Sequence, residues 1–114
     1  MNRSLTHSLH LIGLIEGGWK SFDFEVFRKG IEICRLSPEE PVVALLRYEP
    51  GASVPKHQHK GLETILVLEG EQSDERGNYP AGSLVLNPED SIHSVLSLIH
   101  ISEPTRLGMI SYAV

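Results

Sequence analysis

Two histidines and a glutamate lie close together near the middle of the chain, in the stretch PKHQHKGLETILVLEG. His57 and His59 are one residue apart, and Glu63 follows four residues after the second histidine. Imidazole and carboxylate groups are common ligands of zinc and of the first-row transition metals. The three side chains are therefore a candidate metal site, and His93, much later in the sequence, is the candidate for a fourth ligand.

The spacing of His57, His59 and Glu63 indicates which face of a β-strand each side chain would occupy. Side chains alternate between the two faces of a β-strand, so residues of equal parity share a face. If one strand runs through HQHKGLET without a bulge, His57, His59 and Glu63 all lie on one face. Ile65 and Val67 would then continue the same face as an apolar wall.

The rest of the sequence predicts the elements that must hold such a site. Strands are expected where short alternating or apolar runs are separated by turn residues, at FDFEVF, GIEICRL, VVALLRY, ETILVLEG, SLVLN and IHSV. The stretch SDERGNYPAG contains Asp, Gly, Asn and Pro and is interpreted as a hairpin connection. Many short strands at even spacing are typical of an all-β sandwich or barrel.

Length and charge restrict the class of protein. The chain has 114 residues, which suits one domain with one core. Its net charge of −5, with no basic block, argues against nucleic acid and anionic membranes as partners. The single cysteine, Cys34, cannot form an internal disulfide, and the apolar stretch LHLIGLI is too short to cross a membrane. We therefore expect a cytoplasmic protein.

Two groups of residues resemble the motifs of the cupin superfamily. The first motif is a glycine, His-x-His, a glutamate and a second glycine at fixed spacing, and it is matched by Gly51, His57, His59, Glu63 and Gly70. The second motif is matched by Gly82, Pro88 and His93, without the asparagine that often follows the histidine. The stretch LEGEQSDERGNYPAGSLVLNP resembles in particular the cupin of ChrR-type anti-sigma factors and their stand-alone relatives. The resemblance extends from about Phe24 to Val95.

This resemblance implies a fold and a metal. It implies a cupin jelly-roll barrel, also called a double-stranded β-helix, with one divalent ion held by His57, His59, Glu63 and His93. In ChrR-like cupins the ion is usually zinc, and iron, manganese and nickel are the alternatives. The competing interpretation is a barrel that keeps the motif without a metal. Burying these polar groups inside an apolar barrel would then cost several kcal/mol unless they were otherwise paired.

The C-terminal stretch LSLIHISEPTR differs in character from the rest of the chain. Written back as codons, it resembles the transposon end and adaptor of sequencing libraries, and ISYAV resembles the adaptor's next stretch. We therefore predict a leader over residues 1–20, a cupin domain over 21–95, and a non-native, adaptor-derived tail over 96–114. The barrel is then expected to be truncated at its C-terminal strands, although MISYAV is apolar enough to add a strand by accident.

Three functions are compatible with these residues. The first is a metal-binding module that senses or binds a small molecule or an oxidant. The second is a metal-dependent cupin enzyme, a dioxygenase or isomerase, which would need a further acid, base or substrate anchor inside the barrel. Arg47, Tyr48 and Lys56 are the nearest polar residues in sequence, and each is expected at the surface. The third is a cupin in which the metal only stabilises the fold.

The partners follow from the same comparison. A small-molecule ligand and a homodimer are expected, and Leu62, Leu66 and Leu68 are candidates to face a partner or the second sheet. Binding of a sigma factor is doubtful, because nothing upstream of the cupin motifs has the histidine and cysteine pattern of a sigma-binding domain.

Overall fold

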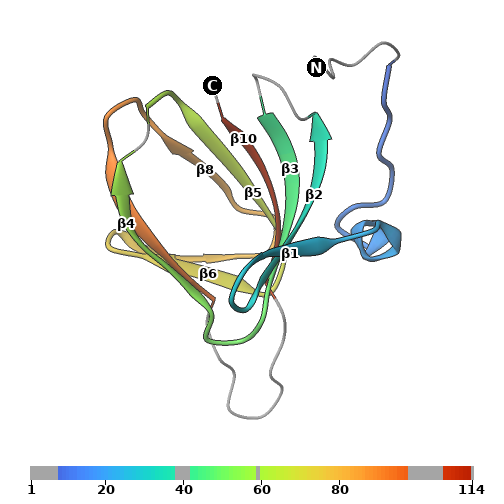
Figure 1. Ribbon diagram of the computed structural model, residues 1–114, viewed down its shortest axis with the longest axis horizontal. Helices are drawn as coiled ribbons and strands as arrows, with labels where there is room; N and C mark the ends of the chain where they lie inside the picture. The colour runs from blue at the N-terminus through green and yellow to red at the C-terminus, as the bar shows by residue number, and fades with distance from the viewer. Residues whose placement is uncertain (1–7, 38–41, 59, 98–106, 114) are drawn as a thin grey trace.

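The computed structural model describes residues 8–37, 42–58, 60–97 and 107–113, which form two facing antiparallel sheets (Figure 1). The larger sheet contains, in spatial order, β1 (Glu25–Arg28), β2 (Ile31–Ser37), β3 (Val42–Tyr48), β10 (Leu107–Ala113), β5 (Glu63–Glu69) and β8 (Leu84–Asn87). The smaller sheet contains β4 (Ser53–Gln58), β9 (Ile92–Ser97), β6 (Glu71–Asp74) and β7 (Gly77–Pro80). The predicted all-β jelly-roll is thus confirmed.

A core fills the space between the two sheets. Its buried members are Ile31, Tyr48, Ile65, Val67 and Val95, which come from β2, β3, β5 and β9. Ile65 and Val67 lie on the inner face of β5, as their parity predicted. The inner wall beside the candidate site is therefore apolar.

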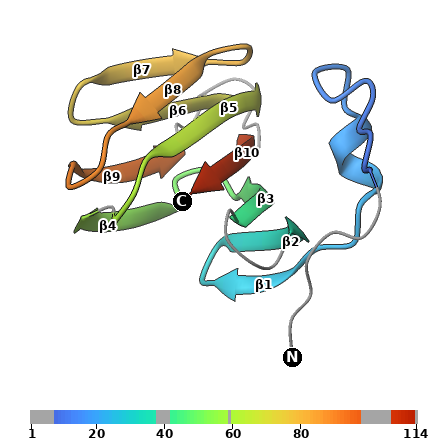
Figure 2. The same ribbon diagram turned by 90° about the horizontal axis from the view of Figure 1, so that it is seen from above.

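A second apolar cluster covers the outer face of the larger sheet. Its buried members are Trp19, Leu45 and Leu68, with Leu66 packed against them. Trp19 belongs to the short 3-10 helix η1 (Gly18–Ser21), which Figure 2 shows outside the barrel. Leu66 and Leu68, which were candidates to face a partner or the second sheet, pack against the N-terminal part of their own chain. Within the described residues, no helix is long and apolar enough to span a membrane.

The segment that holds the first motif does not form one strand. β4 ends at Gln58 and β5 begins at Glu63, and the two strands belong to different sheets. A bulge in β4 lies between Val54 and His57, where Pro55 has no N–H to give to the ladder. The expectation of an unbroken strand through HQHKGLET was therefore wrong, because the chain crosses between the sheets within the motif.

The stretch interpreted as a hairpin connection holds the end of one further strand and the whole of another. β6 and β7 pair with each other from Glu71↔Pro80 to Asp74↔Gly77, which makes a tight hairpin. The polar composition of β6 and β7 concealed the two strands, in which Gln72 is buried and most other residues are half-buried. Gly70 and Gly82 have φ values of 78° and 90°, so both supply the left-handed turn conformation that glycine adopts most easily.

The last described strand completes the larger sheet. β10 lies between β3 and β5 and pairs with both, from Leu107↔Tyr48 to Ala113↔Val42 on the β3 side. This strand falls in the region predicted to derive from an adaptor, and the origin of that region stays a prediction. Residues 98–106, which include most of LSLIHISEPTR, lie outside the described part of the chain.

Candidate metal centre

The two described histidines of the candidate site lie opposite each other in the smaller sheet. His57 on β4 and His93 on β9 are register partners, and their ring centroids are 4.7 Å apart with the planes inclined at 60°. His93 is completely buried. The antiparallel ladder therefore brings together two residues that are far apart in the sequence.

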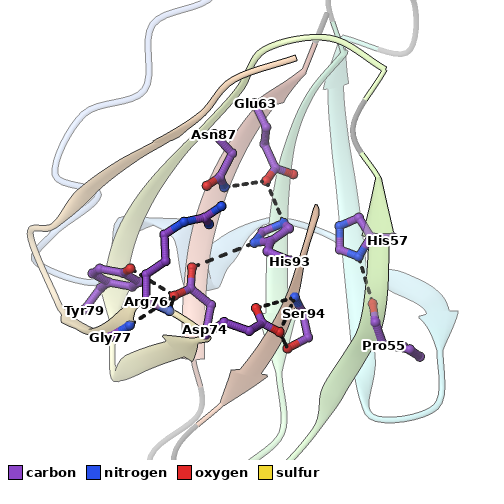
Figure 3. Close-up of polar contacts among 11 residues, drawn as sticks. Pro55, His57, Glu63, Asp74, Arg76, Gly77, Tyr79, Asn87, His93 and Ser94 are labelled. Carbon is purple, nitrogen blue, oxygen red and sulfur yellow. Dashed lines mark hydrogen bonds and ion pairs between the residues drawn. The ribbon is translucent and has the colours of Figure 1, made fainter. Parts of the chain in front are cut away.

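Glu63 reaches the same place from the larger sheet. Its Oε1 lies 3.3 Å from Nε2 of His93, and its side chain is 15% exposed. The contact joins β5 to β9 and so connects the two sheets beside the core (Figure 3). His93 is thus a neighbour of both His57 and Glu63, and the fourth predicted ligand, His59, lies outside the described residues.

Two further groups orient Glu63 and His57. Asn87 on β8 is the register partner of Glu63, and its Nδ2 donates to Glu63 Oε1 at 3.1 Å. Nδ1 of His57 donates to the carbonyl oxygen of Pro55 at 2.9 Å, which leaves Nε2 with the lone pair in the neutral ring. Metal-binding histidines commonly make such a bond with their second nitrogen.

A buried carboxylate lies on the other side of His93. Oδ2 of Asp74 is 3.9 Å from Nδ1 of His93, and both side chains are fully buried. Asp74 and Asn87 were both missed in the sequence. Asn87 directly precedes Pro88 of the second motif, which was the available signal for it, whereas Asp74 lay in the presumed connection.

A cavity of about 500 Å³ opens beside the site, between the sheets. His57, Glu63 and Tyr48 line it together with an apolar wall of Val42, Ala44, Leu46, Ile65 and Val95. Arg28 and Lys56 also contribute to its lining. A volume of this size is typical of sites for small organic molecules.

Of the three polar residues expected at the surface, Tyr48 is inside the barrel. Its side chain is 3% exposed, and burial, together with the charge of Glu63, raises the pKa of its hydroxyl far above the usual value. Arg47 instead lies on the outer face, where it bonds Glu32 at 2.9 Å and covers the ring of Phe24 at 4.3 Å. Lys56 is exposed, as expected, although it borders the cavity.

The donor atoms on these residues fit a divalent metal ion. A carboxylate oxygen only accepts hydrogen bonds, so Oε1 of Glu63 and Nε2 of His93 need a proton or a cation between them. Two ligand atoms bound at about 2.0–2.1 Å to a tetrahedral zinc ion are about 3.4 Å apart, close to the observed 3.3 Å. Within the described ranges no three His, Cys, Asp or Glu side chains already surround one point, and the full ligand set stays a prediction.

Comparisons with solved structures define the class of fold. An RmlC-like cupin from Shewanella frigidimarina superposes with a TM-score of 0.70 at 18% identity, covering 99% of this chain and 94% of that chain. KdgF from Halomonas sp. gives a TM-score of 0.64 at 21% identity, covering 82% and 87%. The protein therefore has the cupin fold.

A narrower assignment comes from the family comparison. The family described as ChrR Cupin-like domain matches residues 18–109, and the chain belongs to this family. A curated relative, the anti-sigma-E factor ChrR of Cereibacter sphaeroides, is 36% identical over 55 residues, which are 48% of this chain and 26% of the relative. The ChrR chain in the Rhodobacter sphaeroides SigE complex gives a TM-score of 0.72 at 22% identity, covering 83% of this chain and 50% of that chain. The matched region is thus about a quarter of the curated relative and half of the ChrR chain in the complex.

Proposed function

We propose that this protein is a metal-binding cupin module that senses or binds a small molecule or an oxidant, with zinc as its ion. The observation that supports it most directly is that buried His93 lies next to both His57 and Glu63, two residues that line an apolar cavity. His59 is the fourth ligand in this proposal. Neutral imidazole and carboxylate also suit iron, manganese and nickel, which are the alternative ions.

The cavity and the cysteine indicate where a signal would act. The apolar wall suits a small molecule with a largely apolar body, and a metal ion would contact that molecule at the His57 and Glu63 end. Cys34 lies outside the cavity, and burial, followed by the charges of Asp23 and Glu25, raises the pKa of its thiol. A thiol that resists ionisation reacts slowly with oxidants, so a response to oxidants would come from the metal site.

The test is the metal content of the purified protein, measured by elemental analysis beside three variants. We expect about one ion per chain in the wild type and a large loss in His57→Ala and His59→Ala. His10→Ala removes an exposed histidine of the N-terminal segment and should leave the metal content unchanged. A folded wild-type protein that takes up no zinc, iron, manganese or nickel would refute the proposal, as would full occupancy in both site variants.

A metal-dependent enzyme is the second candidate, because Tyr48 supplies an inward-facing polar group. The raised pKa makes its hydroxyl a weak acid that stays protonated, so it can donate a hydrogen bond to a bound molecule. Arg28, whose charge acts on the same hydroxyl, would anchor an anionic substrate at the cavity rim. This candidate would be favoured if the metal-loaded protein turns over a substrate and Tyr48→Phe abolishes that turnover with the metal content intact.

A third candidate is a metal that only stabilises the fold. It would be favoured if chelation lowers the melting temperature and neither a ligand nor turnover is found.

A homodimer and a sigma factor are the macromolecular partners to test. Leu84 and Leu86 are 61% and 59% exposed on β8, which is an edge strand of the larger sheet. An interface with a second copy of the chain would bury these two side chains. Light scattering should then report a dimer, which Leu84→Glu should convert to a monomer. A sigma factor is included because the matched ChrR chain is in a complex with SigE.

A further inference from the structure

Asp74 has an evident structural role at the hairpin between β6 and β7. Its Oδ1 accepts hydrogen bonds from the backbone N–H groups of Arg76 at 2.8 Å and Gly77 at 3.2 Å, and from the hydroxyl of Tyr79 at 3.0 Å. These three bonds stabilise the turn. They use one carboxylate oxygen only, and an aspartate that served a turn alone would not need its other oxygen in the interior.

The second oxygen of Asp74 is nevertheless in the interior. Among the described residues, Oδ2 has no hydrogen-bond partner, and the side chain is fully buried. A buried carboxylate oxygen is costly unless a positive or hydrogen-donating group faces it. The group that faces it is Nδ1 of His93, at 3.9 Å, an ion-pair distance that is longer than a hydrogen bond (Figure 3).

His93 thus lies between two carboxylates. Asp74 faces Nδ1, while Glu63 faces Nε2 at 3.3 Å, and the ring of His57 lies alongside. If Nδ1 carries the hydrogen, its N–H is directed toward Asp74, and Nε2 presents its lone pair toward the proposed metal position. If Nε2 carries the hydrogen instead, it cannot bind a metal ion.

We propose that Asp74 is a positioning residue of the metal site: it holds the Nδ1–H tautomer of His93 and so keeps Nε2 available as a ligand. The inference rests on the proposed metal-binding function. A carboxylate that faces the second nitrogen of a ligating histidine favours a hydrogen on that nitrogen, and at 3.9 Å Asp74 does so through its charge. The β6–β7 hairpin, which contributes none of the predicted ligands, would in this way set the affinity of the site.

The first test is Asp74→Asn. The amide oxygen can still accept the three turn hydrogen bonds, whereas the NH2 group now faces Nδ1 of His93 and favours a hydrogen on Nε2. We expect zinc affinity, measured by competition with a chromophoric chelator, to fall about 10-fold to 100-fold. In the metal-free variant, ¹⁵N NMR should report a shift of His93 from the Nδ1–H to the Nε2–H tautomer, which a purely structural effect would not produce.

Tyr79→Phe is the matched control. It removes one of the three bonds to Oδ1 and leaves Oδ2 in place, so the melting temperature should fall while zinc affinity stays unchanged. Equal losses of affinity in both variants would overturn the inference, because they would mean that only hairpin stability matters. If Asp74→Asn does not fold, the ¹⁵N NMR spectrum of the metal-free wild type serves as the test. A neutral His93 in the Nε2–H form would overturn the inference.

The outcomes also separate the inference from the function on which it rests. A wild type that binds no metal refutes the metal site itself. A wild type that binds zinc, with an Asp74→Asn variant of equal affinity and unchanged His93 tautomer, refutes only the role of Asp74.

Discussion

Glu63 is oriented by one residue from each sheet. Asn87, its register partner on β8, donates to Oε1, and His93 approaches the same oxygen from β9. Asn87 is 2% exposed, so its amide is withdrawn from water. Such a buried amide indicates that the direction of the Glu63 carboxylate matters to the site.

Replacing Asn87 with leucine tests this arrangement at the scale of one residue. The change keeps a similar volume and removes a hydrogen bond to a charged group, which contributes about 1.5–3 kcal/mol. We expect the unfolding free energy in urea, measured with excess chelator, to fall by about that amount, and zinc affinity to fall as well. Asn78→Leu, at an exposed position on β7, is the control, and equal stabilities for the two variants would contradict the assignment.

The β6–β7 hairpin is fastened to the outside of β9 by Glu75. Its carboxylate accepts from the backbone N–H of Ser94 at 2.9 and 3.2 Å and from the Ser94 hydroxyl at 2.6 Å. These bonds lower the pKa of Glu75 from 4.5 to about 2. The two faces of β9 are therefore tied to the same hairpin, through Glu75 outside and through Asp74 inside.

The lowered pKa of Glu75 makes the stability of the folded protein depend on pH. Because the folded-state pKa is depressed, the contribution of Glu75 to stability is present above pH 4.5 and is lost as the pH falls toward 2. The melting temperature of Glu75→Gln should therefore fall less steeply than that of the wild type between these values. Glu89→Gln, in the exposed turn before β9, should behave like the wild type. Identical pH profiles for Glu75→Gln and the wild type would show that the Ser94 contacts do not form in solution.

In the molecule as a whole, β10 determines whether the larger sheet is continuous. It pairs along its whole length with β3 and along most of it with β5, and Figure 1 shows it between them. Within the described residues, β3 and β5 are joined in the sheet only through β10. Its backbone pairing thus contributes directly to the closure of the barrel wall.

Removal of residues 107–114 should therefore break the fold. The facing edges of β3 and β5 would lose their partners and expose a ready template for intermolecular pairing. We expect aggregation in size-exclusion chromatography, strong binding of an apolar dye, and loss of cooperative thermal unfolding. A replacement of Leu107–Ala113 by an unrelated strand of the same apolar and polar alternation should restore a folded monomer or dimer. A soluble truncated protein that unfolds cooperatively would contradict this role.

The sequence by itself identified three residues that the structure places near one another, and it identified most of the strands. His57, Glu63 and His93 were identified from residue type and spacing, and the inward direction of Ile65 and Val67 followed from their parity. Gly70 and Gly82 were recognisable because few other residues adopt the left-handed conformation that their turns require. These features depend on local chemistry, which a single stretch of sequence contains.

Only the tertiary structure decided which other residues surround the site. Asn87 and Asp74 belong to it because β8 pairs with β5 and β6 pairs with β9, and a pairing partner is not encoded within either strand alone. Tyr48 faces the cavity because the outer face of β3 is taken by Leu45 under Trp19, which leaves alternate residues to line the inside. The register between distant strands results from the packing of both faces of each sheet at once, and it is therefore fixed only in the folded molecule.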